Sequence, residues 1–453
     1  MKLALVNTRI EPRQWHPIGL CTLAAYVENI CEVRVFDPDP SDITLWDIID
    51  WKPDVIGITA MSQTWNRAQL VAKRLKTMRN PKIIVGGIYA SIRPEEVLEN
   101  KYVDAVCVGE GEEVLKRYLT TGMVDGIYKS ENLIQDLDAL PMQAFHLLDN
   151  IEKYMQPPGT VRGKVMPRGN LGIFTARGCF GKCAFCGSHI IFGRHIRKRS
   201  VDNVIEEIIH IKKTFGDVGI VMQDDTFTAF PKWVTEFCQK IKPLNMLWSC
   251  QTRADCLNYD MAVEMKGAGC VRADMGVESG SDHVLGLLRK GVTRQNYLDS
   301  FAAAHKAGLS IGGTFILGTK GETMEDIEET KSLLRIAKPD MAMFFYLYPF
   351  PGSELYEQYG IPPDNNSTGM QDYPLPTNID NITPEQYVKI RNDMLKISRW
   401  RNLKCYMSWQ GLMFGYKIMT IRGAIIFTKT LFKRGNLYDA LYAVLQHHRK
   451  VKG

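Results

Sequence analysis

Three closely spaced cysteines in a glycine-rich loop constrain this chain more than any other feature of its sequence. Cys179, Cys183 and Cys186 are spaced C-x3-C-x2-C, directly after an apolar run that has the pattern of a strand. Three thiolates on one loop can bind three irons of a cubane cluster and leave the fourth iron open. A zinc site with His189 as the fourth ligand is one alternative, and a buried trio without a ligand is another. Gly178, Gly181 and Gly187, in and beside the motif, let the backbone wrap around a cluster, which favours the iron–sulfur interpretation.

The same spacing resembles the cysteine motif of the radical S-adenosylmethionine (SAM) superfamily. In that superfamily the loop binds a [4Fe-4S] cluster, whose open iron chelates the amino and carboxylate groups of SAM. An electron from an external donor then cleaves SAM to methionine and a 5′-deoxyadenosyl radical. The resemblance therefore implies a radical enzyme that uses a [4Fe-4S] cluster and SAM.

Length and composition are typical of a soluble protein with two or three domains. The chain has 453 residues, of which 45% are hydrophobic and 23% are charged. No apolar run reaches the roughly 18 to 20 residues of a membrane span, and the N-terminus lacks a secretory pattern. The 11 cysteines are odd in number and scattered, so they do not predict a disulfide framework. We expect a cytoplasmic protein that works at low oxygen.

The net charge of +6 is unevenly distributed along the chain. Residues 396–453 hold 12 Lys and Arg residues against one acidic residue, a net charge of +11. Such a tail suits an acidic partner, a membrane surface or nucleic acid, with a solvated basic face as the simplest interpretation. Because a nucleic-acid-binding protein has no need of the cysteine motif, we expect no nucleic acid.

Residues 1–135 are predicted to form a doubly wound, Rossmann-like α/β domain with a mostly parallel sheet. Short runs rich in Val and Ile alternate with helical patterns, an order typical of such sheets. Ligands of these sheets bind at the carboxyl ends of the strands. No strand end has the G-x-G-x-x-G fingerprint, so a nicotinamide or flavin site is not expected. The strand-like runs are 3–7, 33–37, 55–61, 82–87 and 105–110.

The first domain also resembles the cobalamin-binding domain that precedes the cluster loop in cobalamin-dependent radical SAM enzymes. The matching stretches are PIGL (17–20), KPDVIGITAMS (52–62), GGIYASIRPEE (86–96) and VGEGEEVL (108–115). The resemblance implies that cobalamin is a further cofactor. It places the following residues beside the corrin ring or its nucleotide tail: Met61, Ser62, Gln63, Gly86, Gly87, Tyr89, Gly109, Glu110 and Gly111.

The sequence leaves open what lies beneath the cobalt. Many members of the family have His in a G-G-x-H segment, where this chain has Tyr89. Carriers that supply a histidine from below use D-x-H-x-x-G after the first strand, and here His16 and Gly19 are present without the Asp. A loop histidine is more often a surface residue. Tyr89, His16 or neither is therefore expected at the lower face of cobalt.

A rival family, the methylthiotransferases, carries three cluster cysteines in a small α/β domain before the loop. Cys21, Cys31 and Cys107 lie in the matching region, but spacings of 10 and 76 residues are too uneven for that pattern. Cys21 and Cys107 also fall inside apolar helix and strand patterns, where cysteine is usually a small core residue. The methylthiotransferase interpretation is therefore rejected.

Residues 136–167, which are rich in proline and lack periodicity, are predicted to be a linker, and residues 168–351 a partial (β/α)6 barrel. The strand before the cluster loop and five further strand patterns give the six strands that the resemblance implies. In barrels of this type the chemistry lies at the carboxyl ends of the strands. The further strand patterns are 219–225, 247–253, 273–279, 310–318 and 341–350.

Polar residues at these strand ends are the predicted SAM ligands. Asp224 and Asp225 suit the SAM ammonium, with helix capping as the ordinary alternative, and Arg253 suits the SAM carboxylate. Residues 276–281 resemble the family segment G-[VI]-E-S-G-S, which implies that its Glu and Ser hold polar groups of SAM. Gly318 is expected to approach adenine. The full predicted set is Gln223, Asp224, Asp225, Arg253, Glu278, Ser279 and Gly318.

The end of the chain carries less specific signals. Tyr346 and Tyr348 alternate on the last strand pattern, where a catalytic position facing the cavity and core packing are equally open. Residues 352–453 are predicted to be mainly helical, with an N-capped amphipathic helix at 378–400. The apolar and basic segment beyond it could pack under the barrel, close the substrate channel, or rest on a membrane or acidic partner.

Together the resemblances imply a cobalamin-dependent radical SAM methyltransferase of class B. Its expected reaction is transfer of a methyl group to an unactivated sp3 carbon. A protein substrate is our leading expectation, as in the glutamine C-methyltransferase that acts on methyl-coenzyme M reductase, because the chain is compact and its tail basic. One alternative is a non-methylating cyclase or rearrangement enzyme acting on a tetrapyrrole or small metabolite. Another is a corrinoid carrier without catalytic activity.

Overall fold

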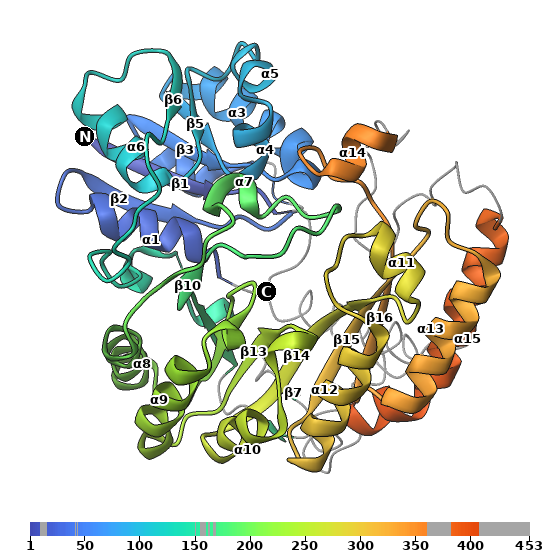
Figure 1. Cartoon of the computed structure of the whole chain (residues 1–453). Coiled ribbons are helices and arrows are strands. Elements are labelled where there is room, and N and C mark those ends of the chain that lie inside the picture. Colours follow the sequence, from blue (N-terminus) through green and yellow to red (C-terminus); the bar gives the residue numbers. More distant parts are fainter. Residues whose placement is uncertain are drawn as a thin grey trace, which may run out of the picture.

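Two six-stranded parallel sheets organise the chain (Figure 1). The first belongs to the N-terminal domain and the second forms an open barrel. No helix among the described residues is long and apolar enough to cross a membrane. The computed structural model describes residues 1–9, 16–40, 42, 44–149, 151–154, 160–161, 164–165, 169–359 and 382–406.

The first sheet has the strand order β2-β1-β3-β4-β5-β6, and all its neighbouring pairs are parallel. The order reverses between β1 and β3, which is where ligands bind in doubly wound sheets. Its strands are β1 (Lys2–Asn7), β2 (Glu32–Phe36), β3 (Val55–Thr59), β4 (Lys82–Gly86), β5 (Ala105–Val108) and β6 (Gly126–Lys129). Its helices are α1 (Ile18–Val27), α2 (Trp46–Trp51), α3 (Trp65–Arg79), α4 (Ile88–Ile92), α5 (Pro94–Leu98) and α6 (Gly111–Thr120). The prediction of a doubly wound domain is confirmed, and β6 was not predicted.

Helices bury both faces of this sheet, which explains why its strands read as continuous apolar runs. Leu5 packs with α1 and α6 on one face, while its neighbour Val6 packs with α2 to α5 on the other. Cys21, Cys31 and Cys107 are buried in the first of these two cores. The prediction that Cys21 and Cys107 are core residues is therefore confirmed.

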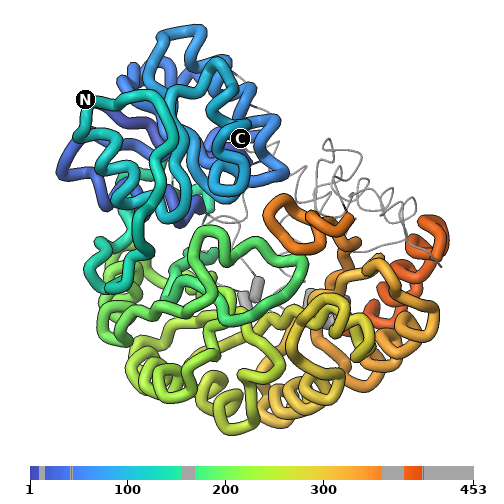
Figure 2. Tube along the Cα trace, turned by 45° about the horizontal axis from the view of Figure 1, so that its top comes forward, coloured from blue at the N-terminus to red at the C-terminus, as the bar shows by residue number. Residues whose placement is uncertain are grey.

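The second sheet has the order β9-β12-β13-β14-β15-β16, again parallel throughout. Figure 2 shows it as an arc below the first domain, and its two edge strands, β9 and β16, do not pair with each other among the described strands. The prediction of a partial barrel with six strands is confirmed. The strands are β9 (Asn170–Ile173), β12 (Gly219–Met222), β13 (Trp248–Thr252), β14 (Cys270–Glu278), β15 (Ile311–Leu317) and β16 (Met341–Tyr346). The outer helices are α8 (Val201–Phe215), α9 (Pro231–Ile241), α10 (Tyr259–Gly267), α11 (Asp282–Leu287), α12 (Arg294–Lys306) and α13 (Met324–Ala337).

Side chains alternate along the barrel strands between an outer core and the barrel interior. On β14, Ala273, Met275 and Val277 are fully buried in the core beneath the helices. Arg272 and Asp274 lie on the opposite, inner face, because successive residues of a strand point to opposite sides. The sheet therefore has an apolar outside and a more polar inside.

Short elements complete the described part of the chain. The cluster loop is framed by β10 (Ala176–Arg177) and β11 (Arg197–Lys198) and contains α7 (His189–Phe192), while β7 (Thr160–Val161) pairs with β8 (Lys164–Val165). After the barrel come α14 (Glu354–Tyr359) and α15 (Pro384–Tyr406). The Thr383 backbone N–H donates to Gln386 Oε1 at 2.7 Å and the Gln386 N–H to Thr383 Oγ1 at 3.3 Å, a capping box that begins α15. The basic segment 407–453 lies outside the described residues.

The first domain contacts the barrel on two sides. Helix α4 lies against α7 of the cluster loop (Figure 1). On the other side, Arg93 donates to the Tyr356 hydroxyl of α14 at 3.4 Å. The connecting segment also packs on the first domain, where Leu148 is buried and the Asp149 N–H donates to the Val35 carbonyl at 2.9 Å. The first domain is thereby held over the barrel edge that carries the cysteines.

Candidate functional site

The three cysteines lie in a loop whose two ends are tied together. Strands β10 and β11 pair antiparallel, with Arg177 opposite Arg197, so residues 178–196 form one closed excursion from the barrel. Gly178 has φ +92°, a conformation that favours glycine, as the loop leaves β10. In the middle of the loop, the Ala184 N–H donates to the barrel carbonyl of Leu288 at 2.9 Å. The loop is therefore anchored at its ends and its centre.

The thiols of this loop have the surroundings of cluster ligands. The Gly181 N–H points at Cys179 Sγ at 3.4 Å, and the Ser188 N–H at Cys186 Sγ at 3.5 Å. Such N–H···S contacts stabilise thiolates and tune bound clusters. Burial raises the pKa of Cys186 to about 11, so the free thiol is protonated and metal binding must displace that proton.

Glycine lets two thiols of this loop come close together. An added Cβ at Gly181 would lie 3.4 Å from Cys179 Sγ and 3.6 Å from Cys183 Sγ. Among the residues that the structure describes, no three His, Cys, Asp or Glu side chains converge to hold one metal ion. Three thiols on one loop suit the irons of a cubane cluster.

Two buried cationic side chains stand beside the cluster loop. Arg253, a predicted SAM ligand, lies with its guanidinium 5.0 Å from the centre of the Phe180 ring and pairs with Asp255 through Nε at 3.0 Å and Nη2 at 3.1 Å. Lys290, which the sequence analysis missed, donates to Glu278 Oε1 at 2.7 Å. Although burial raises the pKa of Cys183, both cations act in the opposite direction. Because each cation is also paired with a carboxylate, this edge of the barrel carries charges of both signs beside the thiols.

Glu278, another predicted SAM ligand, sits at an irregular strand end. It has φ +62°, unusual for a residue with a side chain, at the point where the register between β14 and β15 shifts. Strain of this kind is found where surrounding structure imposes a functional geometry. No sequence signal identified its partner Lys290, because the two residues are twelve positions apart in different elements.

Asp224 is buried at the turn from β9 into β10. Its carboxylate accepts the backbone N–H of Thr175 at 2.6 Å and of Ala176 at 3.0 Å, and also pairs with the Thr175 hydroxyl. With 2% exposure, this carboxylate holds the turn. Its contact with SAM stays a prediction. Asp225, which accepts the Ser188 hydroxyl at 2.5 Å, and the half-buried Gln223 stay predictions.

Ser279 is also turned away from the strand ends. Its hydroxyl lies 3.0 Å from Thr330 Oγ1 and accepts the Ser281 N–H at 3.2 Å, so the buried side chain serves the contact with α13. Its contact with SAM stays a prediction. Gly318, with φ +93° at the end of β15, donates its N–H to Glu322 Oε2 at 2.8 Å. Its proximity to adenine stays a prediction.

The two tyrosines predicted to be catalytic lie in different settings. Tyr346 shares the outer face of β16 with Phe344 and packs against the core, where Arg391 of α15 lies 5.9 Å from its ring centre. The inner positions of β16 belong to Met343 and Phe345, so this geometry favours the core-packing alternative for Tyr346, and its catalytic role stays a prediction. Tyr348 follows the strand, half-buried against Phe350, and its role stays a prediction.

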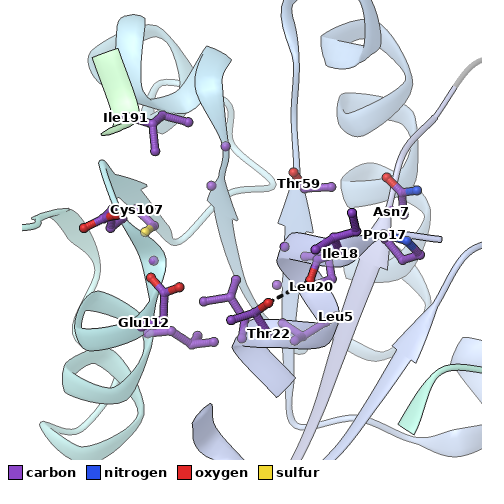
Figure 3. Close-up of a pocket in the computed structure, with 18 of the residues that line it drawn as sticks. Leu5, Asn7, Pro17, Ile18, Leu20, Thr22, Thr59, Cys107, Glu112 and Ile191 are labelled. Atoms are coloured by element: carbon purple, nitrogen blue, oxygen red, sulfur yellow. Dashed lines mark hydrogen bonds between the residues drawn. The ribbon is translucent and has the colours of Figure 1, made fainter. Parts of the chain in front are cut away.

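A cavity of about 290 Å³ lies at the carboxyl edge of the first sheet, between that sheet and the cluster loop. Figure 3 shows Cys107 and Glu112 on one side of it and Ile18 on the other. Its lining is mainly apolar and rich in glycine, which suits a bulky ring system. Lining residues that were predicted are Met61, Gly86, Gly87, Gly109, Glu110 and Gly111. Lining residues that were missed include Gly57 and Thr59 on the first domain and Phe174, Arg177, Ile191 and Phe192 on the barrel side.

Four predicted cobalamin contacts do not line this cavity: Ser62, Gln63, Tyr89 and His16. Tyr89 is buried, with its ring stacked on Trp65 and its hydroxyl donating to Glu96 at 2.6 Å. His16 is buried against Phe145, 2.9 Å from Gln143 Oε1, and burial lowers its pKa to about 4. Because both side chains pack against other residues, this geometry favours the alternative that neither lies at the lower face of cobalt, which stays a prediction.

Known family models match both halves of the chain. Residues 11–119 match the B12 binding domain, and residues 173–334 match the radical SAM superfamily. The two matches cover the first sheet with its cavity and the barrel with its cysteine loop.

Similar proteins are found among curated sequences and solved structures. An uncharacterised methyltransferase of Pyrococcus horikoshii is 33% identical, over 75% of this chain and 78% of that protein. The anaerobic magnesium-protoporphyrin IX monomethyl ester cyclase of Rubrivivax gelatinosus is 28% identical, over 76% of this chain and 66% of its own length. The fold resembles the methyltransferase TsrM of Kitasatospora setae, with a TM-score of 0.62 and 17% identity over 79% of this chain and 75% of TsrM. It also resembles OxsB, with a TM-score of 0.60 and 20% identity, where the match spans 79% of this chain and only 55% of OxsB.

Proposed function

Because the chain belongs to the radical SAM enzymes that carry a cobalamin-binding domain, we propose that it transfers a methyl group to an unactivated sp3 carbon. The cofactors of this family are a [4Fe-4S] cluster, SAM and cobalamin. When bound, they supply a carbon-centred radical that removes a hydrogen atom and a methyl group that replaces it. The observation that carries the proposal is the cavity of about 290 Å³ that is lined by both the first domain and the cluster-loop side of the barrel.

The chain's own residues would place and separate these cofactors. The cysteine loop would hold the cluster, with Cys179, Cys183 and Cys186 as its three ligands. Arg253 and Lys290 put positive charge beside the loop, which favours an anionic group such as the SAM carboxylate. The glycine-lined cavity would hold part of the corrinoid and exclude water from it.

Anaerobic reconstitution tests this reaction. The protein is loaded with iron, sulfide and hydroxocobalamin, reduced, and incubated with SAM labelled at its methyl group and an anaerobic cell extract as the source of acceptor. We expect 5′-deoxyadenosine and S-adenosylhomocysteine to form together, with label entering an acceptor. Formation of 5′-deoxyadenosine without S-adenosylhomocysteine and without a labelled acceptor would contradict methyl transfer.

For the acceptor we propose a carbon atom of a protein side chain. The basic segment 396–453, with a net charge of +11, supports docking on a large acidic partner. In the same experiment, label in the acid-precipitable, protease-sensitive fraction would support this substrate class. Label confined to small molecules would contradict it and leave the methyltransferase reaction standing.

A ring-forming reaction on a tetrapyrrole is the second candidate. It is favoured by the similarity to the magnesium-protoporphyrin IX monomethyl ester cyclase. Incubation of the reconstituted protein with that ester distinguishes the two reactions. Formation of a fifth ring together with 5′-deoxyadenosine, but without S-adenosylhomocysteine, would favour the cyclase reaction. An unchanged ester would exclude the cyclase reaction.

A further inference from the structure

A buried carboxylate of the first domain is bound by two arginines of the barrel. Glu110 follows β5, and its side chain is 1% exposed. Its Oε1 accepts Arg177 Nη1 at 2.9 Å and Arg197 Nη2 at 2.9 Å, while its Oε2 accepts Arg197 Nη1 at 2.9 Å. The backbone N–H of Ile134 adds a fourth donor at 2.7 Å. The carboxylate is thus held in one orientation by four hydrogen bonds.

A second carboxylate extends the same network. Arg177 Nη2 donates to Glu112 Oε1 at 2.5 Å, and the Glu112 side chain is 5% exposed. Although burial alone would raise the pKa of Glu110, the two arginines hold it below its usual value. Buried charges are strongly destabilising unless they are paired and hydrogen-bonded, as they are here.

The arginines occupy the base of the cluster loop. Arg177 ends β10, two residues before Cys179, and Arg197 begins β11 directly opposite it. Arg177 and Glu110 also line the cavity at the first sheet. The network therefore joins the rim of that cavity to the two strands from which the cysteines are suspended.

We propose that Glu110 is a positioning residue, which clamps the first domain to the base of the cluster loop and so fixes the distance between corrinoid and cluster. Burial of paired charges contributes little net stability but enforces one geometry when removal of either partner is strongly unfavourable. Its consequence for catalysis rests on the proposed function, since only a reaction that uses both cofactors needs their distance to be fixed.

The test compares Glu110→Gln with Asp104→Asn. Asp104 also accepts a lysine, Lys76 at 2.7 Å, and a backbone N–H, that of Ile83 at 2.7 Å, but it lies wholly within the first domain. Glu112→Gln serves as a milder variant, because Glu112 takes only one of the arginine donors described here. Urea unfolding of each protein establishes that it is folded before the measurements.

Hydrogen exchange of the cofactor-free protein is the first measurement. In Glu110→Gln we expect exchange at the Ile134 amide and across β10 and β11 to accelerate about 100-fold, because a buried carboxylate pair is broken. In Glu112→Gln the acceleration should be smaller, and in Asp104→Asn it should be confined to the first domain. Unchanged exchange at β10 and β11 in Glu110→Gln would overturn the clamp, as would an equal effect in Asp104→Asn.

Electron paramagnetic resonance of the loaded protein is the second measurement. Cob(II)alamin and the reduced cluster are both paramagnetic, so a nearby cluster accelerates the spin relaxation of cobalt. This acceleration should weaken or become heterogeneous in Glu110→Gln and persist in Asp104→Asn. An identical relaxation rate in Glu110→Gln and the unaltered protein would overturn the positioning role. If no corrinoid binds at all, the proposed function fails, whereas the exchange measurement still decides the clamp.

Discussion

The first sheet and the barrel sheet both end in a functional edge, but they line those edges with different chemistry. The edge of the first sheet is built from glycines and aliphatic side chains around a cavity. The edge of the barrel carries thiols and the ion pairs Arg253–Asp255 and Lys290–Glu278. An apolar cradle suits a large ring system, and a charged rim suits a small zwitterion such as SAM. The two edges therefore differ in the polarity of the ligand that each suits.

The largest expected effect separates the two edges completely. Cys183→Ala removes one of three thiolates, so the cluster should be lost and its visible absorbance and iron content should fall to background. Corrinoid binding, measured by equilibrium dialysis of hydroxocobalamin, should remain. Cys256→Ala is the matched control, since Cys256 is partly buried near Arg253 but outside the loop. Iron retained by Cys183→Ala would contradict the assignment of the cluster.

The ion pairs of the barrel edge are expected to be important for stability. Lys290→Met leaves the buried Glu278 without its cation and should destabilise the fold by about 3–5 kcal/mol. The neighbouring Arg289→Met removes the exposed pair with Glu354 and should cost at most about 1 kcal/mol. Urea unfolding of both variants measures the difference. An equal loss of unfolding free energy in both variants would show that burial of the Lys290–Glu278 pair does not affect stability.

A carboxylate near the same edge should make stability depend on pH. Burial raises the pKa of Glu322 to about 7, while Gly318 N–H and the Tyr387 hydroxyl, 2.9 Å away, partly offset this. Because the folded state then binds the proton more tightly than the unfolded state, stability should fall by about 3 kcal/mol as pH rises from 4.5 to 7. In Glu322→Gln this decline should disappear from urea unfolding curves recorded between pH 5 and 8. A persistent decline of the same size would assign it to other groups.

The smallest effect concerns the apolar edge. At Gly86 an added Cβ would meet Cys107 only at ordinary contact distances, from 3.4 Å, so Gly86→Val should fold. Its larger side chain should fill part of the cavity and weaken hydroxocobalamin binding about 10- to 100-fold, as overpacking of 1–3 kcal/mol would. Cluster content should not change. Gly267→Val in α10 controls for the loss of a glycine, because an added Cβ there would meet nothing within 4 Å. Equal affinities of the two variants for hydroxocobalamin would refute this cavity as the corrinoid site.

The sequence was most informative where function is built from the backbone. Strand patterns located five strands of the first sheet and all six of the barrel, because both sheets bury continuous apolar runs. The resemblance to the cobalamin-binding domain predicted Gly86, Gly87 and Gly109 beside the cofactor, and all three line the cavity. Strand β6 was missed because it is short and only half-buried.

Side-chain roles were harder to predict, because they depend on partners distant in the sequence. Asp224 is hydrogen-bonded to Thr175, and Ser279 to Thr330. Tyr89 is hydrogen-bonded to Glu96 and stacks on Trp65. A motif fixes the residue type at a position but not the direction in which its polar group points. The roles of Lys290 and Arg197 were not predicted, because each depends on an ion pair with a carboxylate that only the fold brings close.

The wall of the cavity at the first sheet comes from segments that are far apart in the chain. The glycine-rich edge is complete by residue 111, whereas Ile191 and Phe192, which line the opposite side, are translated about 80 residues later. The first domain alone therefore presents an open shelf, and the cavity gains its second wall only when the barrel docks.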